Sequence, residues 1–382
     1  MTVLFEVKEE NLETGLRGIP VGYCTTSKVD PVKGLFYREK AISELASWDP
    51  ERVLFLLYHG HDPTREELER FVLDLQKRSF CLPKVLDQIE ALPREGHPMA
   101  LFSAAILILG MFELKNDWRE DCLNMMAKIP IVAAAVINAH AGWGRGAASQ
   151  PELGYMENFA AMLNIPGVKK GQLTEFFRLY DILHFDHGGG NLSTFVGKAV
   201  ASGLEDLYGS IAAAMNALAG PLHGRANQEC LHFIEEMMET LGENASGDEI
   251  EANIRDRLAN KKLVYGFGHA VLRVEDPRAT IQYELAQRRF PSHPLVRFAC
   301  LIRERGSKVL KENPKVANPY PNVDAISGVL LTAAGFGFPE YYTVLFGMSR
   351  CCGIATQIVY ERVIAREGKG TPIVRPKYIY KN

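Results

Sequence analysis

Apolar residues recur through most of this chain at the spacing of α-helices. After Asp62 and Pro63, apolar side chains follow at positions i, i+3, i+4 and i+7, namely Leu68, Phe71, Val72 and Leu75. This spacing places them on one side of a helix. We expect the helix to begin with Asp62 as its cap and Pro63 as its first residue, because proline is tolerated at that position.

Two longer runs carry almost no charge. Residues 98–113 lack charged side chains until their last position, and residues 129–141 have none, so we expect both helices to be buried on most sides. Residues 155–219 show three more helical patterns. Other helical patterns lie at 248–259, 277–289, 294–312 and 339–367. Strand-like alternation is confined to the first forty residues, which are rich in Gly, Pro, Val and Thr. The pattern predicts an all-α fold.

Composition narrows the class of protein. The chain has 382 residues, a fair length for two domains. Its net charge of −3 gives no bulk attraction for nucleic acid. None of its seven cysteines belongs to a CxxC pair, as expected of reduced thiols in a cytosolic protein. The apolar runs are shorter than the ~20 residues of a membrane span, and no targeting signal is evident at the N-terminus. We therefore expect a soluble cytoplasmic protein without nucleic-acid or membrane partners.

Candidate catalytic residues gather in and after residues 220–278. His223 and His269 each stand beside a glycine at the boundary of a helical segment, and Arg278 follows them. Glycine lets the backbone approach a small ligand, and arginine favours an anion. With Asp324, such a set could remove a proton next to a carbonyl and stabilise the enolate, as in the condensation of a thioester with an α-keto acid. Residue types alone leave open that the two histidines are only helix caps.

A second pair of histidines, His184 and His187, precedes three glycines. Two imidazoles with Asp186 offer zinc ligands, but the HExxH pattern of metalloproteases is absent. The glycines favour instead an anion pocket with free backbone N–H groups, and a structural turn is a third interpretation. The stretch 266–268 lacks the third glycine of a dinucleotide-binding loop, and the GxSxG and P-loop patterns are absent. We expect no metal site.

Four motifs in this order resemble those of the citrate synthase family: Gly220–Asn227, Gly266–Leu272, Asp276–Arg278 and Pro321–Gly328. The resemblance extends from residue 15 to residue 377. It implies an all-α fold with a large domain at 1–222 and 335–382 and a smaller one at 223–334. It further implies a homodimer that condenses acetyl-CoA with oxaloacetate, needs no cofactor and completes each active site across the dimer interface.

The resemblance also implies roles for three catalytic residues. His223 would hydrogen-bond the thioester oxygen of acetyl-CoA as the enol forms, and Asp324 would remove the methyl proton. His269 would polarise the keto oxygen of oxaloacetate and support hydrolysis of the citryl thioester. A position at a helix N-terminus should lower the pKa of His223, and a water-poor site should make Asp324 more basic.

Substrate contacts follow from the same resemblance. His187, Arg278 and Arg350 would bind oxaloacetate, and Arg375 resembles the arginine that family members supply across the interface. Arg273 resembles a contact to a CoA phosphate. The backbone loop expected to hold the adenine of CoA spans residues 263–268 and includes Leu263, Val264, Tyr265, Gly266 and Gly268.

The chain departs from the family pattern at two places near these residues. Many members have Glu directly after the histidine that matches His187, whereas Gly188 stands here. The N-terminal Tyr-Arg-Gly-Tyr of many members is replaced by residues 37–40 of different sequence. Two alternatives stay open: a 2-methylcitrate synthase that uses propionyl-CoA, because one methylene changes discrimination by only ~1–3 kcal/mol, and a helical scaffold without catalytic activity.

Overall fold

A small sheet and then a series of helices make up the fold, in a computed structural model that describes residues 3–169 and 171–380. A short 3₁₀ helix, Glu9–Glu13, precedes three antiparallel strands in the order β1-β2-β3. The strands are β1 Ser27–Asp30, β2 Gly34–Tyr37 and β3 Lys40–Ala41. The pairing of Ser27 with Tyr37 sets the register of β1 against β2.

The other regular elements of the described chain are helices joined by loops. The α-helices are α1 Ile42–Leu45, α2 Pro50–His59, α3 Arg65–Arg78, α4 Pro83–Glu90, α5 Pro98–Glu113, α6 Trp118–Ala141, α7 Tyr155–Met162, α8 Thr174–His184, α9 Leu192–Ser202, α10 Leu207–Leu218, α11 Ala226–Leu241, α12 Gly247–Ala259, α13 Pro277–Arg289, α14 Pro294–Lys311, α15 Asp324–Ala334 and α16 Tyr342–Val359. A 3₁₀ turn, Pro339–Tyr341, precedes α16 and a π-helical turn, Tyr360–Ile364, follows it. The prediction of an all-α fold is confirmed.

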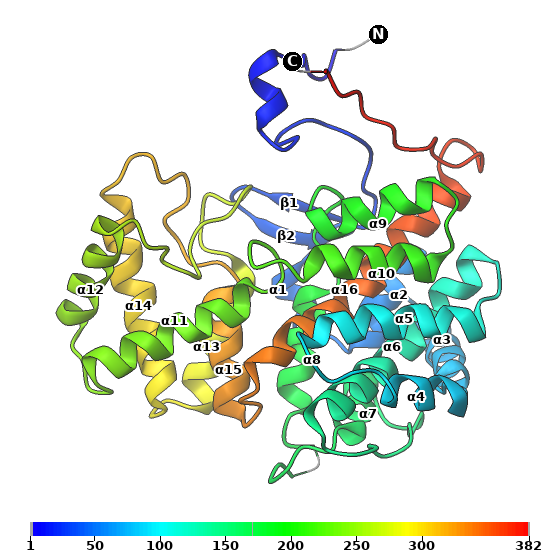
Figure 1. The fold of residues 1–382 in the computed structure, drawn as a ribbon, viewed down its shortest axis with the longest axis horizontal. Helices are drawn as coiled ribbons and strands as arrows, with labels where there is room; N and C mark the ends of the chain where they lie inside the picture. Colours follow the sequence, from blue (N-terminus) through cyan, green and yellow to red (C-terminus); the bar gives the residue numbers. More distant parts are fainter. Residues whose placement is uncertain (1–2, 170, 381–382) are drawn as a thin grey trace.

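The helices form two groups in space (Figure 1). Helices α11 to α15 lie together on the left of the view, with α15 packed against α11, α13 and α14. Most of the remaining helices lie on the right, where α10 packs on α5 and α9 and α16 packs on α6. The division into domains at residues 222 and 335 agrees with this grouping and stays a prediction.

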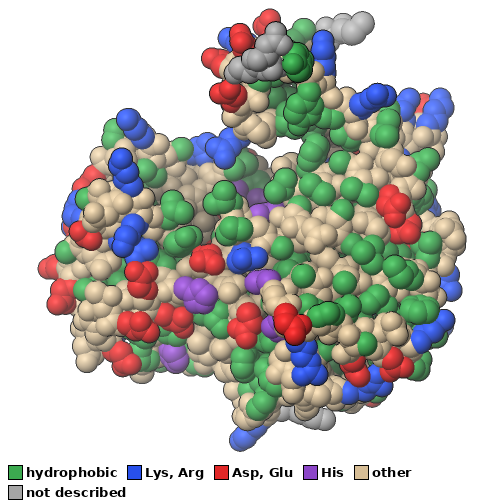
Figure 2. Space-filling model, viewed as in Figure 1, with side chains coloured by type: hydrophobic (Ala, Val, Ile, Leu, Met, Phe, Trp, Pro, Cys, Tyr) green, Lys and Arg blue, Asp and Glu red, His purple; other side chains and the backbone are tan. Residues whose placement is uncertain are grey.

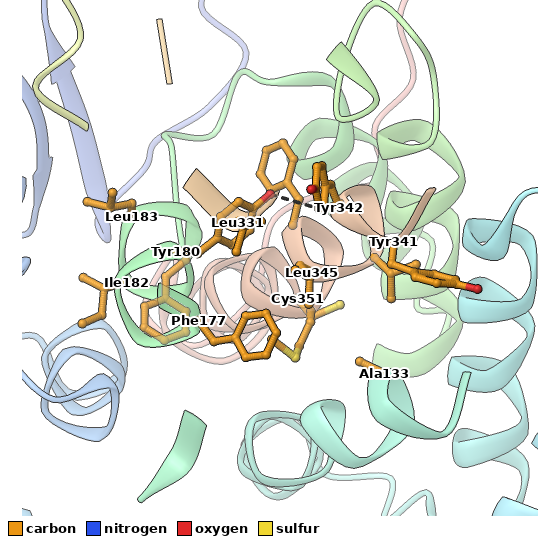
Figure 3. Close-up of a cluster of buried hydrophobic side chains, with 14 of the residues drawn as sticks. Ala133, Phe177, Tyr180, Ile182, Leu183, Leu331, Tyr341, Tyr342, Leu345 and Cys351 are labelled. Atoms are coloured by element: carbon orange, nitrogen blue, oxygen red, sulfur yellow. Dashed lines mark hydrogen bonds between the residues drawn. The ribbon is translucent and has the colours of Figure 1, made fainter. Parts of the chain in front are cut away.

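Buried helices form the core of the larger group. Among the described residues only α6 is long and apolar enough to cross a membrane, yet 89% of its most apolar stretch is buried inside the structure. Every residue of α16 is buried as well. Figure 3 shows the aromatic part of this core, where the Tyr180 hydroxyl of α8 donates to the Tyr342 carbonyl of α16 at 3.2 Å. These helices form a rigid base for the side chains that α8 and α16 carry.

Two details of the predicted helices were wrong. Helix α3 does not begin at Pro63: Thr64 is the cap, its hydroxyl accepts a hydrogen bond from the Glu67 N–H, and the Glu67 carboxylate accepts one from the Thr64 N–H. This reciprocal capping box satisfies two free N–H groups, which Asp62 would not do. Between residues 155 and 219 there are four helices, α7 to α10, instead of three.

Candidate active site

His223 lies in the turn between α10 and α11, where Ser193 fixes its ring. The Ser193 N–H donates to His223 Nε2 at 3.2 Å, and the Ser193 hydroxyl lies 2.9 Å from the same nitrogen. A backbone N–H can only donate, so Nε2 holds the lone pair and the neutral ring carries its proton on Nδ1. The Nδ1–H group is therefore the donor available to a ligand.

The ring of His223 is neutral at physiological pH. Burial, and then the charge of Arg350, lower the pKa of His223 to about 4. The sequence analysis predicted a lowered pKa for His223, and the direction is the same here. It attributed the shift to a neighbouring helix N-terminus, and this cause was wrong. Helix α11 begins only at Ala226, and desolvation with a nearby guanidinium produces the shift.

The loop 263–269 pairs with the segment that leads into α15. Phe267 forms an antiparallel bridge with Pro321, and the Asn322 N–H donates to the Gly266 carbonyl at 2.9 Å. These contacts tie the end of the loop to the first turn of α15. Two candidate catalytic residues, one on each segment, are thereby held close together.

His269 carries its proton on the other ring nitrogen. The backbone N–H groups of Val271 and Leu272 donate to His269 Nδ1 at 3.0 and 2.9 Å, so Nδ1 holds the lone pair and Nε2 carries the proton. Burial, and next the charge of Arg278, lower the pKa of His269 to about 4. The chain thus holds two neutral histidines in opposite tautomers.

Asp324 is the first residue of α15 and is half-buried. Its backbone N–H donates to Asn322 Oδ1 at 3.0 Å. Burial raises the pKa of its carboxyl group to about 7, against the opposing charge of Arg278. A carboxylate with a pKa near neutrality is suited to accept a proton and release it again.

Arg278 is held by the carboxylate two residues before it. Its Nη2 donates to Asp276 Oδ2 at 2.7 Å and its Nε to Asp276 Oδ1 at 3.1 Å. Both side chains are buried. Burial alone would lower the pKa of Arg278, but the charge and hydrogen bonds of Asp276 more than offset it and the pKa is raised. Arg278 therefore keeps its charge inside the protein.

Arg350 projects from the buried helix α16. Its Nε donates to the His184 carbonyl at 2.9 Å, and its guanidinium carbon lies 4.7 Å from the centre of the Phe346 ring. Burial lowers the pKa of Arg350 to about 10, which still leaves it protonated at neutral pH. The His223 ring lies 6.4 Å from the same Phe346 ring.

His187 faces these cations. Its ring centre lies 5.2 Å from that of His269, and its buried Nε2 has no hydrogen-bond partner among the described residues. Burial, then the charges of Arg278 and Arg350, lower the pKa of His187 well below its ordinary value. A buried polar atom without a partner is available for a ligand.

His184 also has a buried Nε2 without a hydrogen-bond partner among the described residues, but its ring is fully enclosed in the core. It is fully buried, it stacks on Tyr180 at 4.1 Å between ring centres, and its Nδ1 donates to the Tyr180 carbonyl at 2.7 Å. In the part of the chain that is described, no three His, Cys, Asp or Glu side chains are placed to hold a metal ion. Of the interpretations left open for this pair of histidines, an anion site at His187 fits the geometry.

The structure brings six of the predicted residues into one electrostatic neighbourhood. Arg278 acts on the pKa of Asp324, His269 and His187, and Arg350 acts on that of His187 and His223. In Figure 2, histidine side chains lie in the hollow between the two groups of helices. Two buried cations suit a dicarboxylate, and a carboxylate base with neutral histidine donors in the same neighbourhood suits proton abstraction next to a carbonyl.

The predicted CoA contacts lie along the edge of this site. Leu263 is 60% exposed, and Gly266 and Gly268 have positive φ angles of 81° and 84°. Arg273 is exposed, while its backbone N–H donates to the Pro31 carbonyl at 2.8 Å. The exposed Leu263 and Arg273 are compatible with contacts to an adenine and a phosphate, whereas Val264, Tyr265 and Gly268 are half-buried and Gly266 is buried.

Arg375 is not joined to the other predicted residues. It is exposed on the C-terminal tail, which lies at the top of the view, apart from α11 to α15 (Figure 1). Val374, the residue before it, donates its N–H to the Ser202 hydroxyl at 2.9 Å. Within one chain, Arg375 is therefore not placed next to Arg278 or Arg350.

Sequence reasoning missed three side chains that shape the site. They are Ser193, which fixes His223, Phe346, which lies against His223 and Arg350, and Asp276, which holds Arg278. Asp276 had a readable signal, since an Asp followed by Pro and then Arg caps a helix with the carboxylate beside the cation. Ser193 and Phe346 reach His223 across large sequence separations, and nothing in the sequence signals those two contacts.

Comparisons with known proteins agree with one another. The chain matches the family described as "Citrate synthase, C-terminal domain" over residues 15–377. It is 38% identical to citrate synthase 4, mitochondrial, of Arabidopsis thaliana, with 96% of this chain and 80% of that protein covered. It is 35% identical to the peroxisomal citrate synthase of Saccharomyces cerevisiae, over 98% of this chain and 85% of that one.

Solved structures give the same result. The citrate synthase of Thermoplasma acidophilum, in a ternary complex with carboxymethyl coenzyme A and oxaloacetate, superposes with a TM-score of 0.84 at 26% identity. That comparison covers 97% of this chain and 96% of the other. The citrate synthase of Thermotoga maritima superposes with a TM-score of 0.82 at 27% identity over the same shares.

Proposed function

The chain belongs to the citrate synthase family, and we propose that it condenses acetyl-CoA with oxaloacetate and water to give citrate and CoA through the residues described above. The family consists of transferases that make citrate, use acetyl-CoA as a substrate and need no cofactor. One observation supports the assignment of residues: the charges of two buried arginines act on a carboxylate with a near-neutral pKa and on two neutral histidines of opposite tautomer.

Asp324 abstracts the proton. Its carboxylate takes a methyl proton of acetyl-CoA, and the electron pair of the C–H bond moves toward the thioester oxygen. His223 donates its Nδ1–H to that oxygen as the enol forms. A neutral donor suits this step because it stabilises the developing charge without placing a permanent cation next to Asp324.

Oxaloacetate is bound by the buried cations. Arg278 and Arg350 pair with its carboxylates, and His187 contacts it through Nε2. His269 donates its Nε2–H to the keto oxygen. The enol carbon then attacks the polarised keto carbon. Hydrolysis of the resulting citryl thioester by water, supported by His269, releases citrate and CoA. Arg273 and the loop 263–268 hold the CoA moiety.

Assembly and location form the remainder of the proposal. The chain acts as a homodimer in which the partner's tail brings Arg375 to the oxaloacetate carboxylates, because Arg375 lies exposed and apart from Arg278 in its own chain. All seven cysteines are free, as in proteins of reducing compartments, and we place the protein in the cytoplasm. Residues 1–222 with 335–382 and residues 223–334 act as two domains that close over the substrates.

The deciding experiment measures free CoA thiol after oxaloacetate is mixed with acetyl-CoA or with propionyl-CoA. We expect a higher kcat/KM for acetyl-CoA. A higher kcat/KM for propionyl-CoA would make the chain a 2-methylcitrate synthase. Failure of both thioesters to release CoA would leave a helical scaffold without this activity.

A further inference from the structure

Asp186, next to His187 in the chain, is a buried carboxylate that the proposed reaction does not use. It is fully buried and accepts hydrogen bonds from the Ser27 hydroxyl at 2.8 Å, from Gln357 Nε2 at 2.8 Å and from the His187 N–H at 2.9 Å. The hydroxyl of Thr26 donates to it as well. Its donors come from a strand, a loop and a buried helix that are far apart in the sequence.

Two of these donors also hold the glycine that follows His187. The Gly188 N–H donates to the Ser27 hydroxyl at 2.7 Å, and Gln357 Nε2 donates to the Gly188 carbonyl at 3.2 Å. Gly188 has a φ of 73°, a conformation that glycine adopts without strain. The backbone is therefore fixed on both sides of His187, by Asp186 before it and by Ser27 and Gln357 after it.

Gln357 is itself held in place. It is buried on α16, two turns after Arg350, and its Oε1 accepts from Lys198 Nζ at 3.3 Å. Lys198 pairs with Glu361 at 2.9 Å, and both side chains are nearly buried. The amide of Gln357 thus has its oxygen fixed by a cation, so its NH₂ group must point to Asp186.

The charge of Asp186 acts on the same site. Burial lowers the pKa of Arg350, and the negative charge of Asp186 is the largest contribution that raises it. The carboxylate reaches Arg350 only through this field, since its oxygen atoms are taken up by the donors named above. A carboxylate that is satisfied by hydrogen bonds and faces away from the ligand can neutralise part of a cationic site without competing for the arginines.

We propose that Asp186, Ser27 and Gln357 are positioning residues that fix His187 for oxaloacetate. They act through the backbone on either side of His187 and touch no substrate atom. The inference deepens the proposed function and rests on it, because it takes the ligand at His187 to be the keto dicarboxylate. It predicts that weakening this network lowers the affinity for oxaloacetate and leaves the handling of acetyl-CoA unchanged.

The test measures binding and turnover of four variants. Gln357→Met keeps the length of the side chain and removes its hydrogen bonds, and Ser27→Ala removes the hydroxyl that Ser27→Thr retains. Thr356→Val is the matched control, because Thr356 is also buried on α16 and its hydroxyl donates to the Cys352 carbonyl of its own helix, at 2.9 Å, rather than to Asp186 or Gly188. Oxaloacetate binding is followed by calorimetry without acetyl-CoA, and kcat and KM by release of CoA thiol.

We expect Gln357→Met and Ser27→Ala each to weaken oxaloacetate binding about tenfold, as for loss of a hydrogen bond to a charged group. Their kcat and their KM for acetyl-CoA should stay within about threefold of the unmodified enzyme. Ser27→Thr and Thr356→Val should bind oxaloacetate within about twofold of it. Unchanged binding in both network variants, or an equal loss in Thr356→Val, would overturn the inference. If the unmodified protein itself releases no CoA, the proposed function fails instead.

Discussion

Arg278 and Asp276 form a buried ion pair in which Nε and Nη2 of the arginine meet both oxygens of the carboxylate, at 2.7 to 3.2 Å. The pair sits at the start of α13, where Asp276 also accepts the Arg278 N–H at 3.0 Å. One carboxylate therefore caps a helix and neutralises a cation that points toward the site.

Removing that carboxylate should destabilise the fold. We expect Asp276→Ala to lower the free energy of unfolding by about 3–5 kcal/mol, because it leaves the buried charge of Arg278 uncompensated. Glu39→Ala is the control, since its ion pair with Lys28 is exposed and should contribute less than about 1 kcal/mol. Urea unfolding measures both. Equal losses for the two variants would contradict the structural role of Asp276.

Replacing the proposed base should stop turnover without preventing binding. We expect Asp324→Ala to lower kcat by about 10²–10⁴-fold, the usual contribution of a general base. Oxaloacetate should still bind, because Arg278 and Arg350 are unchanged. Release of CoA thiol and calorimetry measure the two properties. Retained turnover would place the base elsewhere.

The same carboxylate should control the pH dependence. Burial raises the pKa of Asp324 to about 7, so below pH 7 the base is protonated and log kcat/KM for acetyl-CoA should fall by one for each pH unit. His223 and His269, with pKa values of about 4, stay neutral over that range. A pH–rate profile that stays flat from pH 5 to pH 8 would argue against Asp324 as the titrating group.

Ionisation of Asp324 should lower the stability of the fold as pH rises, although it raises activity over the same pH range. The pKa of Asp324 in the folded state lies above its ordinary value of 3.8, so the folded state binds the proton more tightly than the unfolded state does. The protonated carboxyl therefore stabilises the fold at low pH, and this stabilisation is lost as pH rises from about 4 to about 7. Asp324→Asn carries no charge at any pH. We expect its free energy of unfolding, relative to that of the unmodified chain, to increase over this window in urea titrations.

Gly266 should tolerate no side chain, because it lies against the helix that carries Asp324. Its φ is 81°, and a Cβ atom there would lie 2.9 Å from the Ala325 Cα. Gly242 has a similar φ of 83° with open space around it. Both alanine variants should lose about 1–3 kcal/mol of stability from the positive-φ backbone conformation, but only Gly266→Ala should also lower kcat. Equal kcat values would show that the contact does not matter for Asp324.

Mixing two inactive variants tests the shared site. If Arg375 acts in the partner's site, a dimer of one Asp324→Asn chain and one Arg375→Ala chain contains one site with both residues intact. Co-expression of the two variants should then restore CoA release, while each variant alone stays nearly inactive. Absence of recovery in a purified mixed dimer would confine each site to one chain.

The parts of the fold that short-range signals determine could be predicted. Helix α13 begins at Pro277 and α5 at Pro98 as expected, because proline at the first position and a preceding cap mark a helix start locally. The start of α3 was wrong because two candidate caps, Asp62 and Thr64, stand two residues apart. Only the reciprocal bond with Glu67 decides between them.

The convergence of the site could not be derived from residue types. His223, His269 and Asp324 were joined by resemblance to a family, since nothing within the sequence says which distant loops meet. The tautomers depend on backbone N–H groups of Ser193, Val271 and Leu272, and such orientations follow only from coordinates. Similarly, the low pKa of His223 was expected, but burial and Arg350 are its causes.

Helix α15 begins with Asp324 and packs against α11, α13 and α14, whereas Arg350 belongs to a helix embedded in the other group. The distance between Asp324 and Arg350 is thus set by how the two groups of helices meet. A substitution in the packing beneath α15 that shifts this helix should therefore change the distance between Asp324 and Arg350 without altering either side chain.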